Sequence, residues 1–185
     1  MFLIDSKFDM TPFLALYPRE FSNVLGAITM VFVHSNLEHL LGNSLPLILG
    51  LFLLYSFFEK KATSILIIGH VLTGLLIWVI ARPAYHIGAS GVVYMLVSFI
   101  LISAFISHNK QFRIAALALL SIQSGLIFGI LPQDNQISWE GHLSGAIIGF
   151  LLAFVFKNKG PKPDKPFVWN EVESEVVDEY KQFEN

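Results

Sequence analysis

The sequence predicts an all-α protein, a polytopic bundle of transmembrane helices. The chain of 185 residues is 54% hydrophobic and only 14% charged, a balance that soluble domains rarely have. Its apolar runs also recur at lengths close to the ~20 residues that an α-helix needs to cross a bilayer. The absence of cysteine excludes disulfides, thiolate catalysis and Cys-ligated zinc. A net charge of −2 gives no electrostatic footprint for nucleic-acid binding.

The apolar runs divide the chain into three parts. Residues 1–35 form an N-terminal segment that ends in Phe21–Phe32, an apolar stretch too short to span and typical of a re-entrant or interfacial segment. Residues 36–157 hold five candidate spans, at 36–58, 62–81, 87–106, 114–131 and 139–156. Residues 158–185 are a Lys/Pro linker followed by an acidic tail, which we expect to be solvated and disordered.

The basic residues predict how these spans are oriented. Most of those beside the spans fall at one end of the predicted bundle: Lys60, Lys61, Lys110, Arg113, Lys157, Lys159, Lys162 and Lys165. The positive-inside bias therefore places the C-terminus in the cytoplasm. We expect the membrane to be the plasma membrane of a prokaryote. Five spans then place the N-terminus outside, so we expect that a first span is missing upstream.

Polar residues in three of the spans indicate one site. Asn43, Ser90 and His142 lie in the early turns of the first, third and fifth spans, which all run from outside to inside. They therefore share one depth, in the outer half of the bilayer. Isolated polar residues inside a membrane mark functional sites, and this arrangement predicts that the three side chains meet.

The hydroxyl of Ser90 is the candidate nucleophile, and the imidazole of His142 is the candidate base. Ser90 stands between the small residues of IGASGVVY, and a neutral imidazole is the usual base near neutral pH. Gly145 and Gly149 share the helical stripe of His142, and small residues allow close helix packing. This spacing favours packing on the Ser90 helix. The alternative is that His142 is a buried, hydrogen-bonded histidine and the glycines are ordinary packing residues.

Other side chains are candidates for supporting roles. His39 and Asn43 share a helix face and can both donate hydrogen bonds to an oxyanion, or they are polar contacts between helices. Tyr94, one turn after Ser90, could stack on the imidazole, or it is a packed aromatic residue. Glu140 points to a different face from His142, so a Ser–His dyad is simpler than a triad.

A metal site is the weaker interpretation of the histidines. His34, His39 and His142 could conceivably hold zinc, but their order is not HExxH and no carboxylate in an outer shell is evident. We therefore expect neither a metal nor another cofactor.

Three motifs together resemble those of the rhomboid intramembrane serine proteases. They are HSNLEHLLGN with His34, His39 and Asn43, GASGVVY with Gly88, Ser90, Gly91 and Tyr94, and GHLSGAIIG with His142, Gly145 and Gly149. The resemblance covers residues 17–157. The family's usual first span is absent here, and Leu25 and Gly26 stand where some members have a Trp-Arg pair.

The resemblance implies a role for each of these residues. Ser90 would be the nucleophile and His142 the base. His39, Asn43 and the backbone N–H of Ser90 would bind the oxyanion, with Tyr94 packed on His142. The span at 114–131 would be the mobile helix through which substrates approach.

The function expected from these residues is cleavage of single-span membrane proteins within the lipid bilayer, at a site open to the outer face. The alternative is a catalytically inactive rhomboid-like protein that binds transmembrane helices. A small transporter or channel is disfavoured, because polar residues cluster in the outer half of the spans. The oligomeric state is not indicated by the sequence.

Overall fold

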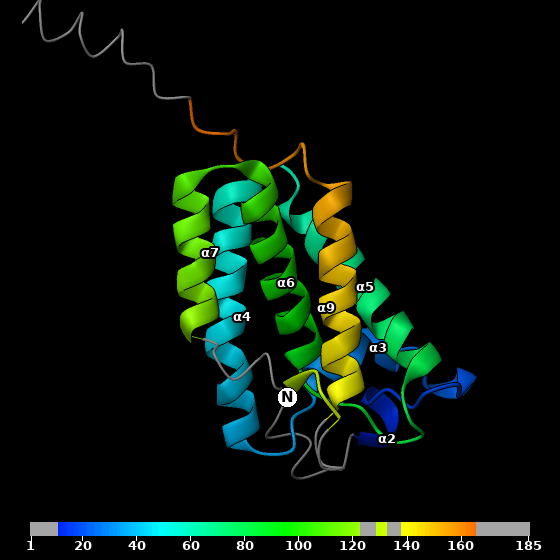
Figure 1. Ribbon diagram of the computed structural model, residues 1–185. Helices are drawn as coiled ribbons and strands as arrows, with labels where there is room; N and C mark the ends of the chain where they lie inside the picture. Colours follow the sequence, from blue (N-terminus) through cyan, green and yellow to red (C-terminus); the bar gives the residue numbers. More distant parts are fainter. Residues whose placement is uncertain (1–10, 123–128, 133–137, 166–185) are drawn as a thin grey trace, which may run out of the picture.

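The computed structural model describes residues 11–122, 129–132 and 138–165, and these residues form a bundle of helices (Figure 1). Two short helices and two 3-10 turns precede the long ones: α2 (Thr11–Leu14), η1 (Phe21–Asn23), α3 (Gly26–Thr29) and η2 (Met30–Phe32). The bundle itself consists of α4 (Leu37–Phe58), α5 (Ala62–Ile80), α6 (Ser90–Ser107), α7 (Lys110–Ile122) and α9 (Trp139–Val155).

Among the described residues, three helices are long and apolar enough to cross a membrane. They are α4, α5 and α6, with 22, 19 and 18 residues, so the all-α fold is confirmed, and the apolar helices are consistent with a multi-pass membrane protein. The apolar helix α9 has 17 residues, and α7 has 13. Residues 123–128 of the predicted fourth span lie outside the described residues. The count of five spans therefore stays a prediction.

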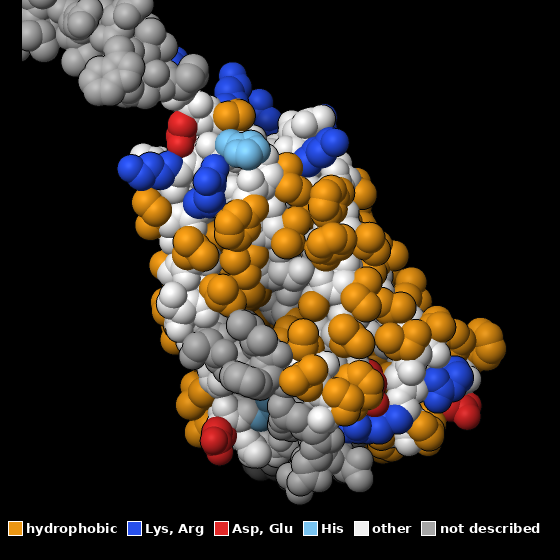
Figure 2. All heavy atoms as spheres, viewed as in Figure 1, with side chains coloured by type: hydrophobic (Ala, Val, Ile, Leu, Met, Phe, Trp, Pro, Cys, Tyr) orange, Lys and Arg blue, Asp and Glu red, His pale blue; other side chains and the backbone are white. Residues whose placement is uncertain are grey.

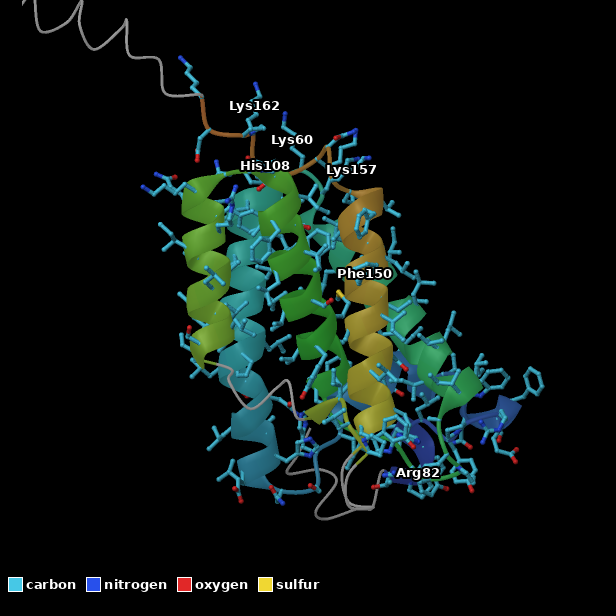
Figure 3. The ribbon with its side chains drawn as sticks, viewed as in Figure 1. Lys60, Arg82, His108, Phe150, Lys157 and Lys162 are labelled. Atoms are coloured by element: carbon cyan, nitrogen blue, oxygen red, sulfur yellow. The ribbon has the colours of Figure 1, made fainter. Side chains whose placement is uncertain are left out.

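Apolar side chains cover the face of the bundle that Figure 2 shows, in a belt between two charged ends. Figure 3 labels Lys60, His108, Lys157 and Lys162 at one end and Arg82 at the other. Basic residues therefore gather at one end of the bundle, as the sequence predicts. The structure contains no bilayer, so the sidedness itself remains a proposal.

Helix α6 begins at Ser90, three residues later than the start of the predicted run at Ile87. Gly88 causes the delay, since its φ of +97° lies in the left-handed region that only glycine adopts readily. The N–H groups of a helix's first turn have no partner within the helix. Ser90 therefore stands at the end of α6 where both its hydroxyl and its backbone N–H are available to a ligand.

Helix α6 occupies the centre of the bundle, with α4, α5, α7 and α9 around it (Figure 1). Its most extensive contact among the described helices is with α9. A Cβ atom at Gly145 would overlap the carbonyl of Gly91, and one at Gly149 would lie 2.9 Å from the backbone nitrogen of Phe99. The two backbones therefore touch along the stripe that carries His142, as the glycine spacing predicts.

Substitution of Gly145 by alanine is expected to destabilise the bundle by about 1–3 kcal/mol, because the added methyl group has no room against the α6 backbone. Gly42→Ala on α4 is the matched control, since a Cβ atom there meets nothing within 4 Å. Thermal unfolding of both variants in one detergent measures the difference. Equal midpoints for Gly145→Ala and Gly42→Ala would contradict close packing of α6 on α9.

The N-terminal segment crosses the end of α5 that lies beside Arg82. Leu16 and His86 form an antiparallel bridge, with N···O distances of 3.0 and 2.8 Å. The guanidinium of Arg19 donates to the carbonyl of Ala81 over 2.7 Å. Phe21–Phe32 consists of short turns whose large side chains are mostly exposed, with Phe21 81% exposed. This exposure fits the prediction of a stretch embedded at a membrane surface.

Residues 158–165 of the predicted linker contact the turn between α6 and α7. The backbone N–H of Lys110 donates to the carboxylate of Asp164 over 2.6 Å, and the amide of Asn109 donates to the carbonyl of Lys162 over 3.0 Å. Asp164 therefore neutralises the N-terminus of α7. The predicted acidic tail falls within residues 166–185, outside the described part of the chain.

Candidate active site

Ser90 and His142 are hydrogen-bonded across the interface of α6 and α9. Ser90 is the first residue of α6 and His142 is in the first turn of α9. The Ser90 Oγ lies 2.9 Å from the His142 Nε2, within the range required for proton transfer between a nucleophile and its base. Both side chains are half-buried.

The carbonyl of Gly129 fixes the orientation of the imidazole. It lies 2.8 Å from the His142 Nδ1, and because a carbonyl can only accept, the Nδ1–H donates to it. The Nε2 is thereby left as the acceptor for the Ser90 hydroxyl. On one face, the Tyr94 ring stacks on the imidazole, with centroids 4.2 Å apart and planes 10° from parallel. A carbonyl and an aromatic ring therefore hold the imidazole, a role that a carboxylate has in the Ser-His-Asp hydrolases.

The contact with Gly129 could not be found from the sequence, because any residue carries a backbone carbonyl. A Cβ atom at this position would overlap the hydroxyl of Tyr94 and lie 3.1 Å from the His142 Nδ1. Only glycine therefore lets the chain approach the imidazole this closely while Tyr94 stays stacked on it.

Asn43 and His39 lie beside the backbone that leads into Ser90. A Cβ atom at Gly88 would be 2.7 Å from the His39 Nε2 and 3.4 Å from the Asn43 Nδ2. Asn43 is 8% exposed, and its buried Nδ2 has no hydrogen-bond partner. The other ring nitrogen of His39, Nδ1, lies 3.3 Å from the Ser35 hydroxyl. An unpaired buried donor is unfavourable, so the Asn43 amide is available for an acceptor that the site receives.

His34 contacts the ring of His39 and does not bond to Ser90 or His142. The two rings meet edge to face with centroids 5.1 Å apart, and His34 is 4% exposed with neither ring nitrogen hydrogen-bonded. Burial lowers the pKa of His34, and the nearby His39 acts in the same direction. His34, His39 and His142 do not form a metal-binding group, and none occurs elsewhere among the described residues.

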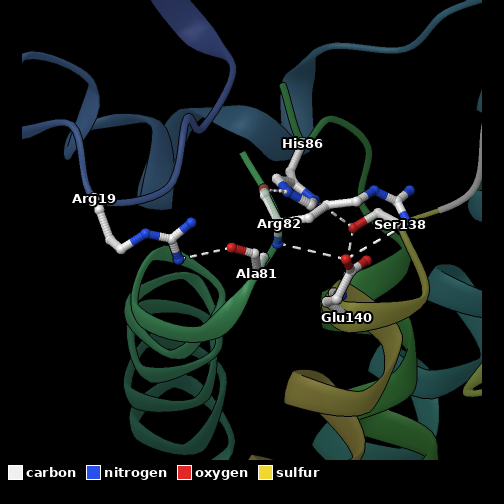
Figure 4. A network of polar contacts seen from close by, with 7 residues as sticks. Arg19, Ala81, Arg82, His86, Ser138 and Glu140 are labelled. Carbon is white, nitrogen blue, oxygen red and sulfur yellow. Dashed lines mark hydrogen bonds and ion pairs between the residues drawn. The ribbon is translucent and has the colours of Figure 1, made fainter. Parts of the chain in front are cut away.

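A second polar cluster joins the loops that precede α6 and α9 (Figure 4). The His86 Nδ1 lies 2.6 Å from the Ser138 Oγ, and the His86 Nε2 lies 3.1 Å from the Arg82 carbonyl. Arg82 also forms an ion pair with Glu140 at 3.5 Å. Glu140 is thus engaged away from the dyad, as its position on a different face from His142 predicts.

Sequence reasoning singled out neither His86 nor Ser138. The available signal was weak: Ser138 directly precedes α9, which is the preferred position for a capping serine, and its Oγ does accept from the Gly141 N–H. Nothing in the sequence indicated that this cap would meet a histidine from the α5–α6 loop.

Comparisons with known proteins agree with the motifs. The family model of the Rhomboid domain matches residues 22–159. An uncharacterized protein of Mycobacterium tuberculosis is 30% identical over 148 residues, which cover 75% of this chain and 61% of that protein. A protein of Acanthamoeba polyphaga mimivirus, provisionally named a rhomboid protein, is 30% identical over 153 residues, 73% of this chain and 77% of its own length. The chain thus spans about three fifths of the M. tuberculosis relative.

Proposed function

The chain belongs to the rhomboid family, and on this premise we propose that it is an intramembrane serine endopeptidase with a Ser90–His142 dyad. The observation that carries the proposal is the 2.9 Å contact between the Ser90 Oγ and the His142 Nε2. Many members of the family are serine proteases. The presence of both residues and of the bond between them favours catalysis over binding of transmembrane helices without cleavage.

The geometry supports a two-step acyl transfer. The His142 Nε2 takes the hydroxyl proton of Ser90 while Oγ bonds to the carbonyl carbon of the scissile peptide. The same Nε2–H then protonates the leaving amine, which breaks the C–N bond and leaves an acyl-enzyme. Water, deprotonated by His142, attacks the ester, and the proton returns to Ser90 as the acid product leaves.

The oxyanion of each tetrahedral intermediate needs donors that are already in place. The backbone N–H of Ser90 is available because it lies at the start of α6. The unpaired Nδ2 of Asn43 and the Nε2 of His39 approach the same backbone from α4. Gly88 leaves the space between them open, since a Cβ atom there would press on His39.

The substrates that this site suits are single-span membrane proteins with an unwound, small-residue segment near the outer face. Ser90 and His142 lie at the starts of α6 and α9, whereas His108 and Lys157, which follow the ends of these helices, lie at the lysine-rich end of the bundle (Figure 3). The dyad therefore lies at the opposite end, and the positive-inside rule places the lysine-rich end in the cytoplasm. Helix α7 packs on α6 and α4, and an open, apolar groove lies between α6, α7 and α9, beside Tyr94. This groove supports α7 as the helix that moves to admit a substrate.

The test is cleavage of a single-span substrate after co-reconstitution with the protein in liposomes. The unchanged protein should cut it, and Asn43→Ala should lower kcat about 10²–10³-fold, the usual loss when one oxyanion donor is removed. Ser44→Ala is the matched control, because its hydroxyl bonds only to the Leu40 carbonyl of the same helix. An Asn43→Ala variant as active as Ser44→Ala would remove Asn43 from this role. No cleavage by the unchanged protein would contradict the proposed function.

A further inference from the structure

The two members of the dyad are preceded by two residues that bond to each other. His86 lies four residues before Ser90, and Ser138 lies four residues before His142. Their 2.6 Å contact directly links the loop entering α6 to the loop entering α9 (Figure 4). The starts of the two helices are therefore connected at the dyad and in the loops just before it, and the ion pair of Arg82 with Glu140 adds a further link.

Two contacts other than the one to Ser138 hold His86 in place, which makes it a firm anchor for Ser138. Its backbone exchanges two hydrogen bonds with Leu16 of the N-terminal segment. Its Nε2–H donates to the Arg82 carbonyl, which can only accept. The Nδ1 is then an acceptor, and the Ser138 hydroxyl donates to it. The charged groups around this histidine are Arg82 on its own loop and Glu140 on α9.

Ser138 connects His86 to the first turn of α9. Its oxygen accepts from the N–H of Gly141, directly before His142, while its hydrogen is given to His86. Gly145 and Gly149 hold α9 against α6 one and two turns further along. The glycine contacts set the distance between the helix axes, and the contact at Ser138 sets where the first turn of α9 lies along and around its axis.

We propose that His86 is a positioning residue for catalysis: by binding Ser138 it fixes the first turn of α9 so that the His142 Nε2 stays within hydrogen-bond reach of the Ser90 Oγ. This inference rests on the proposed function. A misplacement of ~1 Å between reacting groups can lower a rate about 10²-fold. A contact that keeps the starts of α6 and α9 aligned therefore matters for the rate.

Three substitutions at one position separate this role from a general contribution to stability. In His86→Asn, the side-chain oxygen lies near the place of Nδ1 and can accept from Ser138. In His86→Gln, the longer side chain reaches the Arg82 carbonyl instead and leaves Ser138 without its acceptor. His86→Ala removes both bonds.

The readout is the rate at which a fluorophosphonate probe labels Ser90 in the full chain in detergent, together with kcat and KM for a cleaved substrate. His86→Ala and His86→Gln should label about 10–10²-fold more slowly, with kcat lowered and KM unchanged, and His86→Asn should recover most of the rate. Adding Ser138→Ala to His86→Ala should lower the rate by less than the product of the two single losses, because the contact is already absent and only the cap on the Gly141 N–H is newly lost.

Thermal midpoints of the same variants provide the comparison for a purely structural role. Rates that follow the midpoints across the three variants, or a His86→Ala variant that labels as fast as the unchanged protein, would overturn the inference and leave the proposed function intact. Failure of the unchanged protein to label at Ser90 would overturn both.

Discussion

Replacement of Ser90 by alanine is expected to abolish cleavage of a single-span substrate, lowering kcat by roughly 10⁴–10⁶-fold to the background rate. The reason is chemical: the Ser90 Oγ, which is hydrogen-bonded to the His142 Nε2, is the nucleophile of the proposed reaction. Without it, the oxyanion donors can still bind the peptide group but no acyl-enzyme can form. Quantified cleavage in liposomes measures the loss.

The matched control for this experiment is Ser103→Ala on the same helix. Ser103 is buried and its hydroxyl has no hydrogen-bond partner, so its removal should leave both activity and stability close to those of the unchanged protein. A Ser90→Ala variant that retains more than a few per cent of the cleavage rate would contradict the assignment of the nucleophile.

Replacement of His142 by alanine is expected to lower kcat by a similar factor, because the hydroxyl of Ser90 is a poor nucleophile without a base to take its proton. The double variant Ser90→Ala/His142→Ala should be no slower than either single variant, since residues that act as one unit are not additive. Parallel cleavage assays of the three variants in liposomes provide the measurement.

Folding must be checked for each of these variants, because His142 also contacts Tyr94 and Gly129. Thermal midpoints in detergent serve this purpose. A double variant whose loss equals the product of the two single losses would indicate that Ser90 and His142 act independently, against a dyad.

The helical architecture could be predicted because a helix that crosses a membrane requires a long apolar run, and such runs can be recognised in the sequence. The runs at 36–58, 62–81 and 87–106 correspond to α4, α5 and α6 within a few residues. The boundaries of α7 were harder, since it begins at Lys110 rather than near residue 114 and includes Arg113. Its first turn is polar and lies at the end of the bundle, where the backbone N–H of Lys110 bonds to Asp164. A polar turn of this kind cannot be recognised from the positions of apolar runs.

The candidate site could be predicted in its side chains but not in its backbone. Helical spacing put His39 on the face of Asn43 and put His142 on the face of Gly145 and Gly149, because residues three and four apart are neighbours on a helix. The carbonyl of Gly129 and the left-handed Gly88 depend on the path of the chain outside the helices. No residue pattern encodes that path.

The contact of His86 with Ser138 could not be predicted from the sequence either. Its partners lie 52 positions apart on two loops, and each residue type is common in loops for reasons unrelated to catalysis. Only the packing of α9 on α6 brings these loops together.

The most direct test of the account is the site at which a fluorophosphonate probe modifies the full chain, located by mass spectrometry of its peptides. The account predicts one adduct on Ser90, absent from Ser90→Ala and formed far more slowly in His142→Ala, because the probe needs a hydroxyl activated by the imidazole. An unmodified Ser90, or an adduct that forms equally fast without His142, would contradict it.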